Sequence, residues 1–499
     1  MKKLCTLLLL AMTITACQVS PAAESVEMMT DQQIADFDWN DFTIFEENLI
    51  PEVYSVLDTL TTAPYYLLNF ELDETLETVK GTVVVRYTNN SQDTLESLLF
   101  QLFPAVYGGW VDLGEITVNE QTVDVEANRS SVVVTIPLTE TLMPGSSCVV
   151  RIPFESSIPR DMGGNYGLYG YFDEVVVLDG FYPLLALYDE GKWHMNITSF
   201  NGDIKFEEMS FYQVTGEMPS DLVAITTGQE IATQKSGDMK TVQYIAGPVR
   251  EFYLAASEQF VTQEQQVGET NLLSTGMQGS EDAIAHAMEI GEASFQIYTD
   301  RFGVYPYSEM DVISTPMQAL GMEYPGVATV TTRLYDLNGD MNGTPNRVYL
   351  DSVIAHEVGH QWFFNLVGND QIEEPWLDEA ITQYIVGLFY EDYYGPTAAQ
   401  SYKESWAERW SRVDFSEIPI GKPSYAYDPS EYSPIVYGRG PYFIEALEAE
   451  MGSEIFGEAL HHYVDDFGWQ IATGDDFKAH MEAACECDLT NLFNEWVTP

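Results

Sequence analysis

Two histidines and a glutamate are spaced in a way that suits a metal site. His356-Glu357-Val358-Gly359-His360 places the histidines four residues apart. Four residues of an α-helix turn through about 400°, so both imidazoles project from one face. Such a pair can reach one Zn²⁺ with Zn–N bonds of about 2.0–2.1 Å. Glu357 would stand beside the ion without being needed as a ligand, where it could take a proton from a water molecule.

Glu379 could supply the third ligand that a catalytic zinc site requires. It lies 19 residues after His360, within Trp376-Leu377-Asp378-Glu379-Ala380, and it opens a second helical stretch over residues 379 to 391. That stretch could lie antiparallel to the first and bring the carboxylate to the same ion. An amphipathic helix with two satisfied histidines explains the short motif alone, because five-residue patterns recur by chance. Such a helix does not explain why Glu379 follows within Trp376-Leu377-Asp378-Glu379-Ala380.

Two further residues have types that could contact a substrate near such a metal. Glu323, in Ala319-Leu320-Gly321-Met322-Glu323-Tyr324-Pro325, lies 33 residues before His356. A carboxylate on a loop beside an edge strand could hold a positively charged group. Tyr437 lies in Val436-Tyr437-Gly438-Arg439-Gly440, and its phenol could donate a hydrogen bond to an oxyanion. Taken alone, a solvated loop acid and a buried tyrosine are the simpler interpretations.

Together these residues resemble the M1 family of zinc aminopeptidases, the gluzincins. The family pattern is His-Glu-x-x-His followed, after 18 residues, by Glu, and His356, Glu357, His360 and Glu379 match it in full. The resemblance implies one Zn²⁺ per chain, held by His356, His360 and Glu379, with Glu357 as the catalytic base.

The same resemblance suggests roles for the other two residues. Glu323 matches the acid of the family's Gly-x-Met-Glu-Asn motif, which binds the free α-amino group of the substrate, although Leu320 and Tyr324 replace its Gly and Asn. Tyr437 matches the transition-state tyrosine of the Tyr-x-Lys-Gly pattern, with Arg439 in place of the lysine.

The resemblance runs from about residue 64 to the C-terminus. It implies an α+β multidomain protein, in which an N-terminal antiparallel β-sandwich precedes a thermolysin-like, mostly helical catalytic domain. Local patterns of β-branched and aromatic residues, turn signals and helical periodicity agree with this order. We expect strands at residues 66–72, 81–87, 131–136, 310–315 and 326–332, and a helix at residues 281–302.

These patterns divide the chain into four segments. We expect a lipoprotein signal peptide at 1–16, an acidic tether at 17–63, the sandwich domain at 64–260 and the zinc peptidase domain at 261–499. The tether is rich in acids and holds no lysine or arginine, and a short helix is expected around residues 45–60. Many family members continue into a helical domain over the active site. Here we expect an open cleft, or one covered by another subunit in an oligomer.

Charge and cysteine content limit the partners. The chain has 78 acidic and 21 basic residues, a net charge of −57, which argues against binding nucleic acid or, by charge alone, anionic lipid. Cys148, Cys485 and Cys487 would remain after export, and an odd count gives no disulfide framework. Cys485 and Cys487 are two residues apart, which is awkward for a bridge, so we interpret both as structural cysteines.

The N-terminus has the features of an export signal. Lys2 and Lys3 precede an apolar run over residues 4–14, which is shorter than the roughly 20 residues that span a bilayer. Ile14-Thr15-Ala16-Cys17 resembles a bacterial lipobox, in which Cys17 is lipidated and becomes the first mature residue. We therefore expect an exported lipoprotein, anchored to a bacterial membrane through Cys17. A simple cleaved signal with an incidental cysteine is the alternative.

The sequence predicts zinc-dependent hydrolysis of peptide bonds, with removal of N-terminal residues from peptides. Three alternatives stay open at this point. An open cleft could serve an endopeptidase, and a degenerate site could belong to a peptide-binding lipoprotein. A structural zinc site is less consistent with the residues, because only three ligands are evident and a structural site has four.

Overall fold

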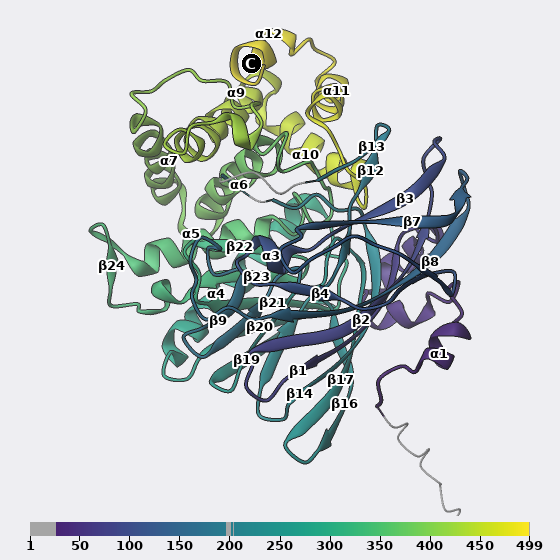
Figure 1. The fold of residues 1–499 in the computed structure, drawn as a ribbon. Coiled ribbons are helices and arrows are strands. Elements are labelled where there is room, and N and C mark those ends of the chain that lie inside the picture. The colour runs from purple at the N-terminus through teal and green to yellow at the C-terminus, as the bar shows by residue number, and fades with distance from the viewer. Residues whose placement is uncertain (1–25, 196–200, 203, 499) are drawn as a thin grey trace, which may run out of the picture.

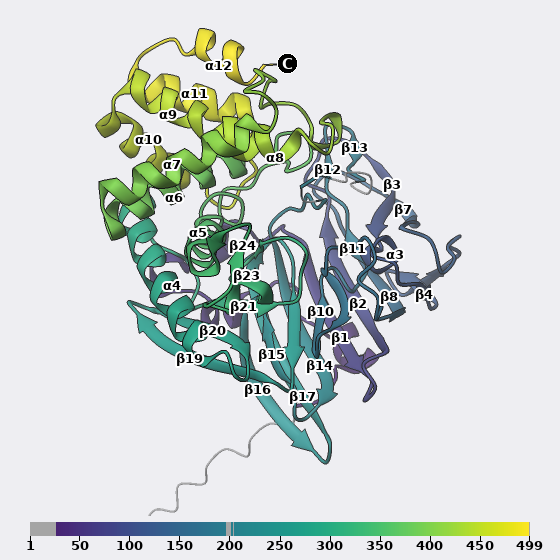
Figure 2. The ribbon, with the colours of Figure 1, turned by 90° about the vertical axis from the view of Figure 1, so that its left-hand side faces the viewer.

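The computed structural model describes residues 26–195, 201–202 and 204–498, so Cys17 and the expected signal peptide lie outside the described residues. Strands dominate the first half of the chain and helices the second, as Figure 1 shows by colour. In Figure 2 most of the green and yellow helices lie together at the upper left, and the strands fill the centre and the right of the view. The α+β class and the order of sandwich and helical domain are confirmed. Among the described residues, no helix combines the length and apolar character needed to cross a membrane.

A nine-stranded sheet forms one layer of the sandwich. Its order is β16-β17-β14-β1-β2-β8-β5-β6, with β4 paired to β8, and the β1–β14 pair is parallel while the other described pairs are antiparallel. Burial alternates along β8, as a period of two requires when one face of a sheet meets a core. The bounds are β1 Tyr65–Leu72, β2 Thr78–Thr88, β4 Val111–Leu113, β5 Ile116–Val118, β6 Gln121–Val123, β8 Ser147–Ser157, β14 Ser210–Pro219, β16 Gln229–Ser236 and β17 Met239–Val249.

Smaller sheets complete the N-terminal half. They follow the orders β15-β18-β10-β9, β11-β3-β7 and β12-β13. The strands expected at residues 66–72, 81–87 and 131–136 correspond to β1, β2 and the start of β7. The bounds are β3 Leu95–Gln101, β7 Val133–Leu142, β9 Tyr169–Phe172, β10 Val175–Leu178, β11 Leu184–Leu185, β12 Tyr188–Asp189, β13 Lys192–Trp193, β15 Val223–Thr226 and β18 Leu254–Ser257, with a short helix α3 at Phe103–Val106.

The segment expected as an acidic tether packs against the sandwich over its second half. Phe42 and Phe45 are buried, and their rings lie 5.5 Å from the ring of Tyr65 in β1. Arg86 in β2 donates to the backbone carbonyl of Trp39 at 2.8 Å. Aromatic burial therefore outweighs the acidity of the segment. In place of the one short helix expected, the structure has α1 Asp31–Ala35, η1 Thr43–Glu47, η2 Pro51–Val53 and α2 Val56–Thr59.

A five-stranded sheet opens the second half of the chain. Its order is β19-β20-β21-β23-β22, with β20, β21 and β23 parallel and β22 antiparallel at the edge. The strands expected at residues 310–315 and 326–332 correspond to β21 and β23. Helix α4 (Glu281–Phe302) matches the expected helix and lies beside this sheet in Figure 2. The strand bounds are β19 Phe260–Val267, β20 Thr270–Met277, β21 Glu309–Thr315, β22 Gly321–Tyr324 and β23 Val327–Thr331.

Helices fill the rest of the chain. The first of them, α5, lies against α4 and α6, and the yellow C-terminal helices lie farthest from the sandwich in Figure 1. The bounds are η3 Thr332–Tyr335, α5 Asn346–Gly359, α6 Trp376–Tyr394, α7 Pro396–Ser411, η4 Ser424–Ala426, α8 Tyr432–Pro434, η5 Ile435–Arg439, α9 Gly440–Met451, α10 Ser453–Phe467, α11 Gly474–Cys485 and α12 Thr490–Trp496, with a β24–β25 hairpin at Asp340–Met341 and Thr344–Pro345.

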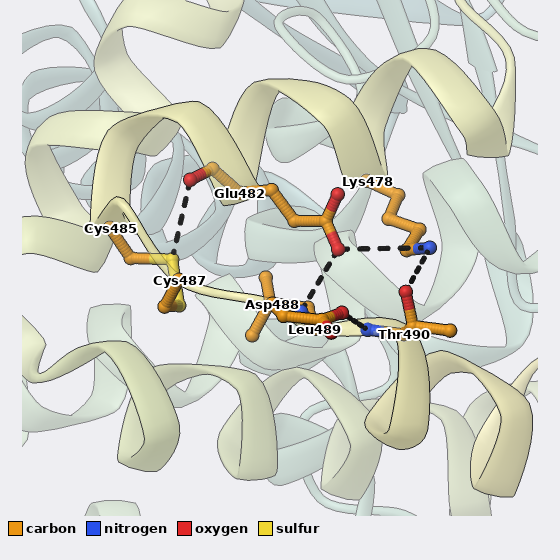
Figure 3. The surroundings of a disulfide bond; sticks show 7 residues. All are labelled: Lys478, Glu482, Cys485, Cys487, Asp488, Leu489 and Thr490. Atoms are coloured by element: carbon orange, nitrogen blue, oxygen red, sulfur yellow. Dashed lines mark hydrogen bonds and ion pairs between the residues drawn. A yellow bond between two sulfur atoms is a disulfide. The ribbon is translucent and has the colours of Figure 1, made fainter.

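Cys485 and Cys487 form a disulfide, which corrects the expectation that a two-residue spacing is awkward for a bridge. Helix α11 ends at Cys485, and Glu486 adopts a left-handed conformation with φ of 49°. This turn brings the two Cα atoms to 5.1 Å, a separation that a disulfide can span. Figure 3 shows the bridge beside Glu482, whose carboxylate accepts from the backbone N–H of Leu489 at 2.9 Å.

Candidate metal centre and active site

His356 lies in the last turn of helix α5, and His360 caps the C-terminus of that helix. Leu350, Ile354 and Val358 are buried, so the helix packs into the core, where a second helix meets its last turn. That helix is α6, which approaches closely at Gly359. A Cβ at Gly359 would lie 2.9 Å from Cδ1 of Ile385 in α6, so glycine permits this approach.

The predicted ligands His356, His360 and Glu379 come together. The Nε2 atoms of the two histidines are 3.1 Å apart, and Glu379 Oε2 lies 3.0 Å from Nε2 of His356 and 3.5 Å from Nε2 of His360. All three residues are buried, and their ligand atoms lie within 4.8 Å of one another. Two imidazoles and one carboxylate converging on a point form a donor set that suits Zn²⁺.

Electrostatics and tautomers agree with a cation at that point. Burial, followed by the charge of His360, lowers the pKa of His356 to about 4, so its imidazole is neutral as a metal ligand must be. Burial also disfavours the charged form of Glu379, but its bonds to both histidines outweigh this and hold its pKa below the usual range. His360 Nδ1 lies 3.0 Å from the backbone carbonyl of Phe363. A carbonyl only accepts, so Nδ1 carries the hydrogen and Nε2 is left to bind metal.

Glu357 is buried beside the ligands and pressed against β22. A Cβ at Gly321 would lie 2.1 Å from Oε1 of Glu357, so this position admits only glycine while the carboxyl stays in place. Burial, and then the negative charge of Glu323, raise the pKa of Glu357 well above its usual range. Glu357 is not one of the three candidate metal ligands, so its carboxyl is available to a water molecule or to substrate.

Glu323 lies on β22 at the edge of the five-stranded sheet, buried rather than in a solvated loop. Its Oε1 accepts from Gln371 Nε2 at 2.8 Å, and the same amide nitrogen donates to Asp378 Oδ2 at 2.9 Å. Glu323, His360 and Asp378 also bring ligand atoms within 4.8 Å of one another. Burial raises the pKa of Glu323, and no lysine or arginine is bonded to its carboxylate among the described residues.

Sequence reasoning assigned no function to Gln371, and Asp378 entered only as part of a motif. Asn369 Nδ2 holds the other oxygen of Asp378 at 2.9 Å. These amides precede α6 in a loop, and no periodic pattern distinguishes them from ordinary loop residues. Their effect is to fix the orientation of Glu323 and Asp378 relative to the metal group.

Tyr437 lies on η5, a π-helical turn that leads into α9. Its hydroxyl donates to Oε1 of Glu379, the oxygen that faces away from the histidines. Gly440 allows η5 to approach α6, because a Cβ there would lie 2.7 Å from Cβ of Ala380. The predicted tyrosine is therefore placed beside the predicted ligand.

The turn after α5 is strained and is held by an arginine from the sandwich. Phe364 has φ of 122°, which side-chain-bearing residues rarely adopt. Arg250 donates from Nε to the carbonyls of Phe364 (2.8 Å) and Asn365 (3.2 Å), and from its terminal nitrogens to the carbonyls of Glu207 and Gln470 (both 2.9 Å). Sequence analysis did not identify Arg250, since nothing local marks it.

The second half of the chain is similar to a known peptidase domain. Residues 286–496 match the family profile described as "Peptidase family M1 domain". Aminopeptidase M1 of Arabidopsis thaliana is 25% identical over 407 residues, which are 77% of this chain and 46% of that protein. Aminopeptidase M1-D of Oryza sativa subsp. japonica is 27% identical over 337 residues, 64% of this chain and 38% of that protein. The chain thus spans less than half the length of these relatives.

A solved structure resembles the fold over nearly its whole length. It is an M1 zinc metallopeptidase from Deinococcus radiodurans, with a TM-score of 0.67 and 18% sequence identity. The match covers 87% of this chain and 93% of that one. The arrangement of sandwich and helical domain is therefore one that a zinc metallopeptidase is known to adopt.

Proposed function

We propose that this chain is a zinc metallopeptidase of family M1 that removes N-terminal residues from peptides. The observation that carries the proposal is the convergence of His356, His360 and Glu379 on one point, with Glu357 and Tyr437 at its edge. A structural zinc site fits less well, because the group offers three ligands and leaves a position for water or substrate.

The residues around the metal would divide the reaction among them. Zn²⁺ held by His356, His360 and Glu379 would supply Lewis acidity toward the scissile carbonyl and the attacking water. Glu357 would take a proton from that water and pass it to the leaving amine. Tyr437 would donate its phenol hydrogen to the oxyanion as the carbonyl becomes tetrahedral.

Glu323 is proposed to bind the free α-ammonium of the substrate. Its carboxylate is buried, lies near His360 and is bonded to a neutral amide rather than to a cation. A buried charge without a partner is costly, and an ammonium would balance it. A free N-terminus at Glu323 fixes the first peptide bond at the metal group, which makes the enzyme an exopeptidase.

The test is a panel of aminoacyl fluorogenic substrates beside their N-acetylated forms, with and without a chelator. We expect hydrolysis only with metal bound and much faster cleavage of free-amino substrates. Glu323→Ala should raise KM for free-amino substrates and reduce that preference, whereas Glu458→Ala, an exposed acid on α10, should not. Equal cleavage of free and acetylated peptides by the wild type would favour an endopeptidase. No metal-dependent cleavage of either would reject the peptidase.

We also propose that the protein is exported and anchored through a lipid on Cys17. Support comes from the lysines, short apolar run and Ile14-Thr15-Ala16-Cys17 at the N-terminus. The test is detergent partitioning of wild type and Cys17→Ser. The wild type should enter the detergent phase, and the variant should be released or left unprocessed. A processed Cys17→Ser protein that remains on the membrane would contradict lipid anchoring at this residue.

A further inference from the structure

Arg409 is a cation beside the metal group, and it has no salt-bridge partner among the described residues. It lies on α7, and its guanidinium carbon is 5.5 Å from the centre of the Tyr437 ring. No hydrogen bond or ion pair joins its side chain to a described residue, although it lies within electrostatic range of Glu379.

The packing of α7 on η5 fixes this position. A Cβ at Gly438 would lie 2.9 Å from the backbone nitrogen of Trp410 and 3.2 Å from the carbonyl of Trp406. Glycine therefore lets η5 press directly on the backbone of α7, one residue from Arg409. The half-buried guanidinium is held over the catalytic tyrosine by this close approach rather than by a salt bridge.

Two other buried arginines bond to several backbone carbonyls. Arg250 bonds to four backbone carbonyls. Arg439 bonds to the carbonyls of Ile418, Glu495 and Trp496 at 2.9–3.1 Å. Arg409 is half-buried, and none of its nitrogens is a buried atom without a partner, so water can meet its donors. Its five N–H donors are therefore accessible to a ligand that enters the site and displaces that water.

A series of pairwise contacts connects Glu323 to Arg409 through the metal group. Glu323 lies beside His360, Glu379 contacts both histidines, its other oxygen binds Tyr437, and Arg409 covers the Tyr437 ring. The series begins with a carboxylate and ends with a guanidinium. A peptide with its ammonium at Glu323 and its first carbonyl at the metal would extend its leaving side toward Tyr437 and Arg409.

We propose that Arg409 binds a carboxylate on the leaving side of the substrate, so that the enzyme favours short peptides whose free C-terminus reaches this guanidinium. A guanidinium binds a carboxylate through two parallel hydrogen bonds. An aspartate or glutamate side chain just after the cleaved bond offers the same chemistry. This inference rests on the proposed function and adds the class of substrate to it.

The experiment compares four substrates that share one N-terminal residue, chosen as the best of the fluorogenic panel. The first substrate is the dipeptide in which alanine follows that residue, and the second is the amide of the same dipeptide. The third is the dipeptide amide in which aspartate replaces the alanine. The fourth is the anilide of the N-terminal residue, which has no carboxylate. Wild type, Arg409→Gln and Arg412→Gln are assayed for kcat, KM and bound zinc. Arg412 is exposed and lies three residues after Arg409. Arg412→Gln therefore removes the same charge as Arg409→Gln and serves as its control.

We expect the wild type to cleave the free dipeptide roughly 10- to 100-fold better in kcat/KM than its amide, the range for a charged hydrogen-bonded pair. Arg409→Gln should bring that ratio close to one, mainly through KM and with normal zinc content, while Arg412→Gln keeps it. A preference for the aspartate amide instead would assign the side chain as the source of the carboxylate.

Two outcomes overturn the inference. One is a wild type that hydrolyses the anilide but shows no preference for either carboxylate. The other is an Arg409→Gln variant that loses kcat equally on all four substrates, because the arginine then only positions Tyr437. Hydrolysis of the anilide tests the proposed function by itself. A failure of the proposed function can therefore be distinguished from a failure of this inference.

Discussion

Arg250 donates from Nε to the backbone carbonyl of Phe364 at 2.8 Å, across 114 positions of the chain. Arg250 directly follows the sandwich strand β17, and this bond links it to the turn that ends the metal-binding helix. The turn contacts two functional residues. The carbonyl of Phe363 accepts from His360 Nδ1 at 3.0 Å, and Asn365 Nδ2 lies 3.3 Å from the carbonyl of Glu323. The sandwich therefore takes part in orienting a metal ligand.

Replacing Arg250 with lysine should weaken metal binding as well as stability. One ammonium cannot serve four carbonyls, and each buried acceptor left unmet costs about 1–3 kcal/mol. The strained turn at Phe364 would relax and move the acceptor that orients His360. We expect a lower Tm, weaker zinc affinity by chelator competition and a reduced kcat.

Arg86→Lys is the matched control for Arg250→Lys. Arg86 is also buried and bonds to the carbonyls of Trp39, Thr61 and Ala63, at the N-terminal segment rather than the metal site. It should lower Tm while zinc affinity stays normal. Equal zinc affinity in wild type and Arg250→Lys would mean that the arginine acts on stability alone.

Glu357→Gln should retain zinc and lose most of its turnover. The amide has nearly the same shape but cannot accept the proton, and general-base steps contribute about 10²–10⁴-fold. Steady-state kinetics beside metal analysis measures both quantities. Glu458→Gln, an exposed residue on α10, should behave as wild type. A kcat near normal in Glu357→Gln would point to another base.

Gly321→Ala tests the contact between β22 and the catalytic carboxyl. The new methyl would overlap Glu357 Oε1, which lies 2.1 Å from the Cβ position, so the carboxyl must move. A misplacement of about 1 Å can cost on the order of 10²-fold in rate. We expect a large loss of kcat with zinc retained. Gly164→Ala, where nothing lies within 4 Å of a new Cβ, should have no effect. Full activity in Gly321→Ala would show that Glu357 has freedom to shift.

Tyr437→Phe should depress kcat more than it raises KM. The hydroxyl donates to Glu379 at rest, and it is expected to serve the oxyanion only as the transition state forms. Removal of one oxyanion donor costs about 10²–10³-fold in kcat in a well-studied case. Kinetics on one fluorogenic substrate is sufficient. An unchanged kcat would reduce Tyr437 to a packing residue.

The metal group could be predicted from sequence because its geometry is local or nearly so. Helical spacing alone puts His356 and His360 on one face, and Glu379 lies in the first turn of the next α-helix along the chain. The helix at residues 281–302 was likewise marked by its periodicity and by Gly303, which ends it with φ of 101°.

Contacts between distant segments could not be predicted in the same way. Arg250 reaches a turn more than a hundred residues away, and no local pattern marks either end. Phe42 and Phe45 bury their rings against the sandwich although their segment is acidic throughout. The bridge between Cys485 and Cys487 depends on one left-handed residue. Such features follow from tertiary packing, which outweighs composition and local propensity.

The stability of the protein should fall as pH rises from about 4.5 to about 7, and Glu309 should account for part of the fall. Burial, followed by the negative charges of Glu230 and Glu264, raises the pKa of Glu309 to about 7. Burial and the charge of Glu309 raise the pKa of Asp311, two residues along β21 and with Oδ1 unbonded among the described residues. The folded state therefore holds protons in this window that the unfolded state has released, so the unfolding free energy decreases with pH.

Glu309→Gln stays neutral at every pH and should flatten the profile, gaining roughly 1–3 kcal/mol over wild type at pH 7.5 and little at pH 4.5. Denaturant unfolding at both pH values measures this, with exposed Glu292→Gln on α4 as the control. Parallel profiles for wild type and Glu309→Gln would show that Glu309 is ionised in the folded protein across this range.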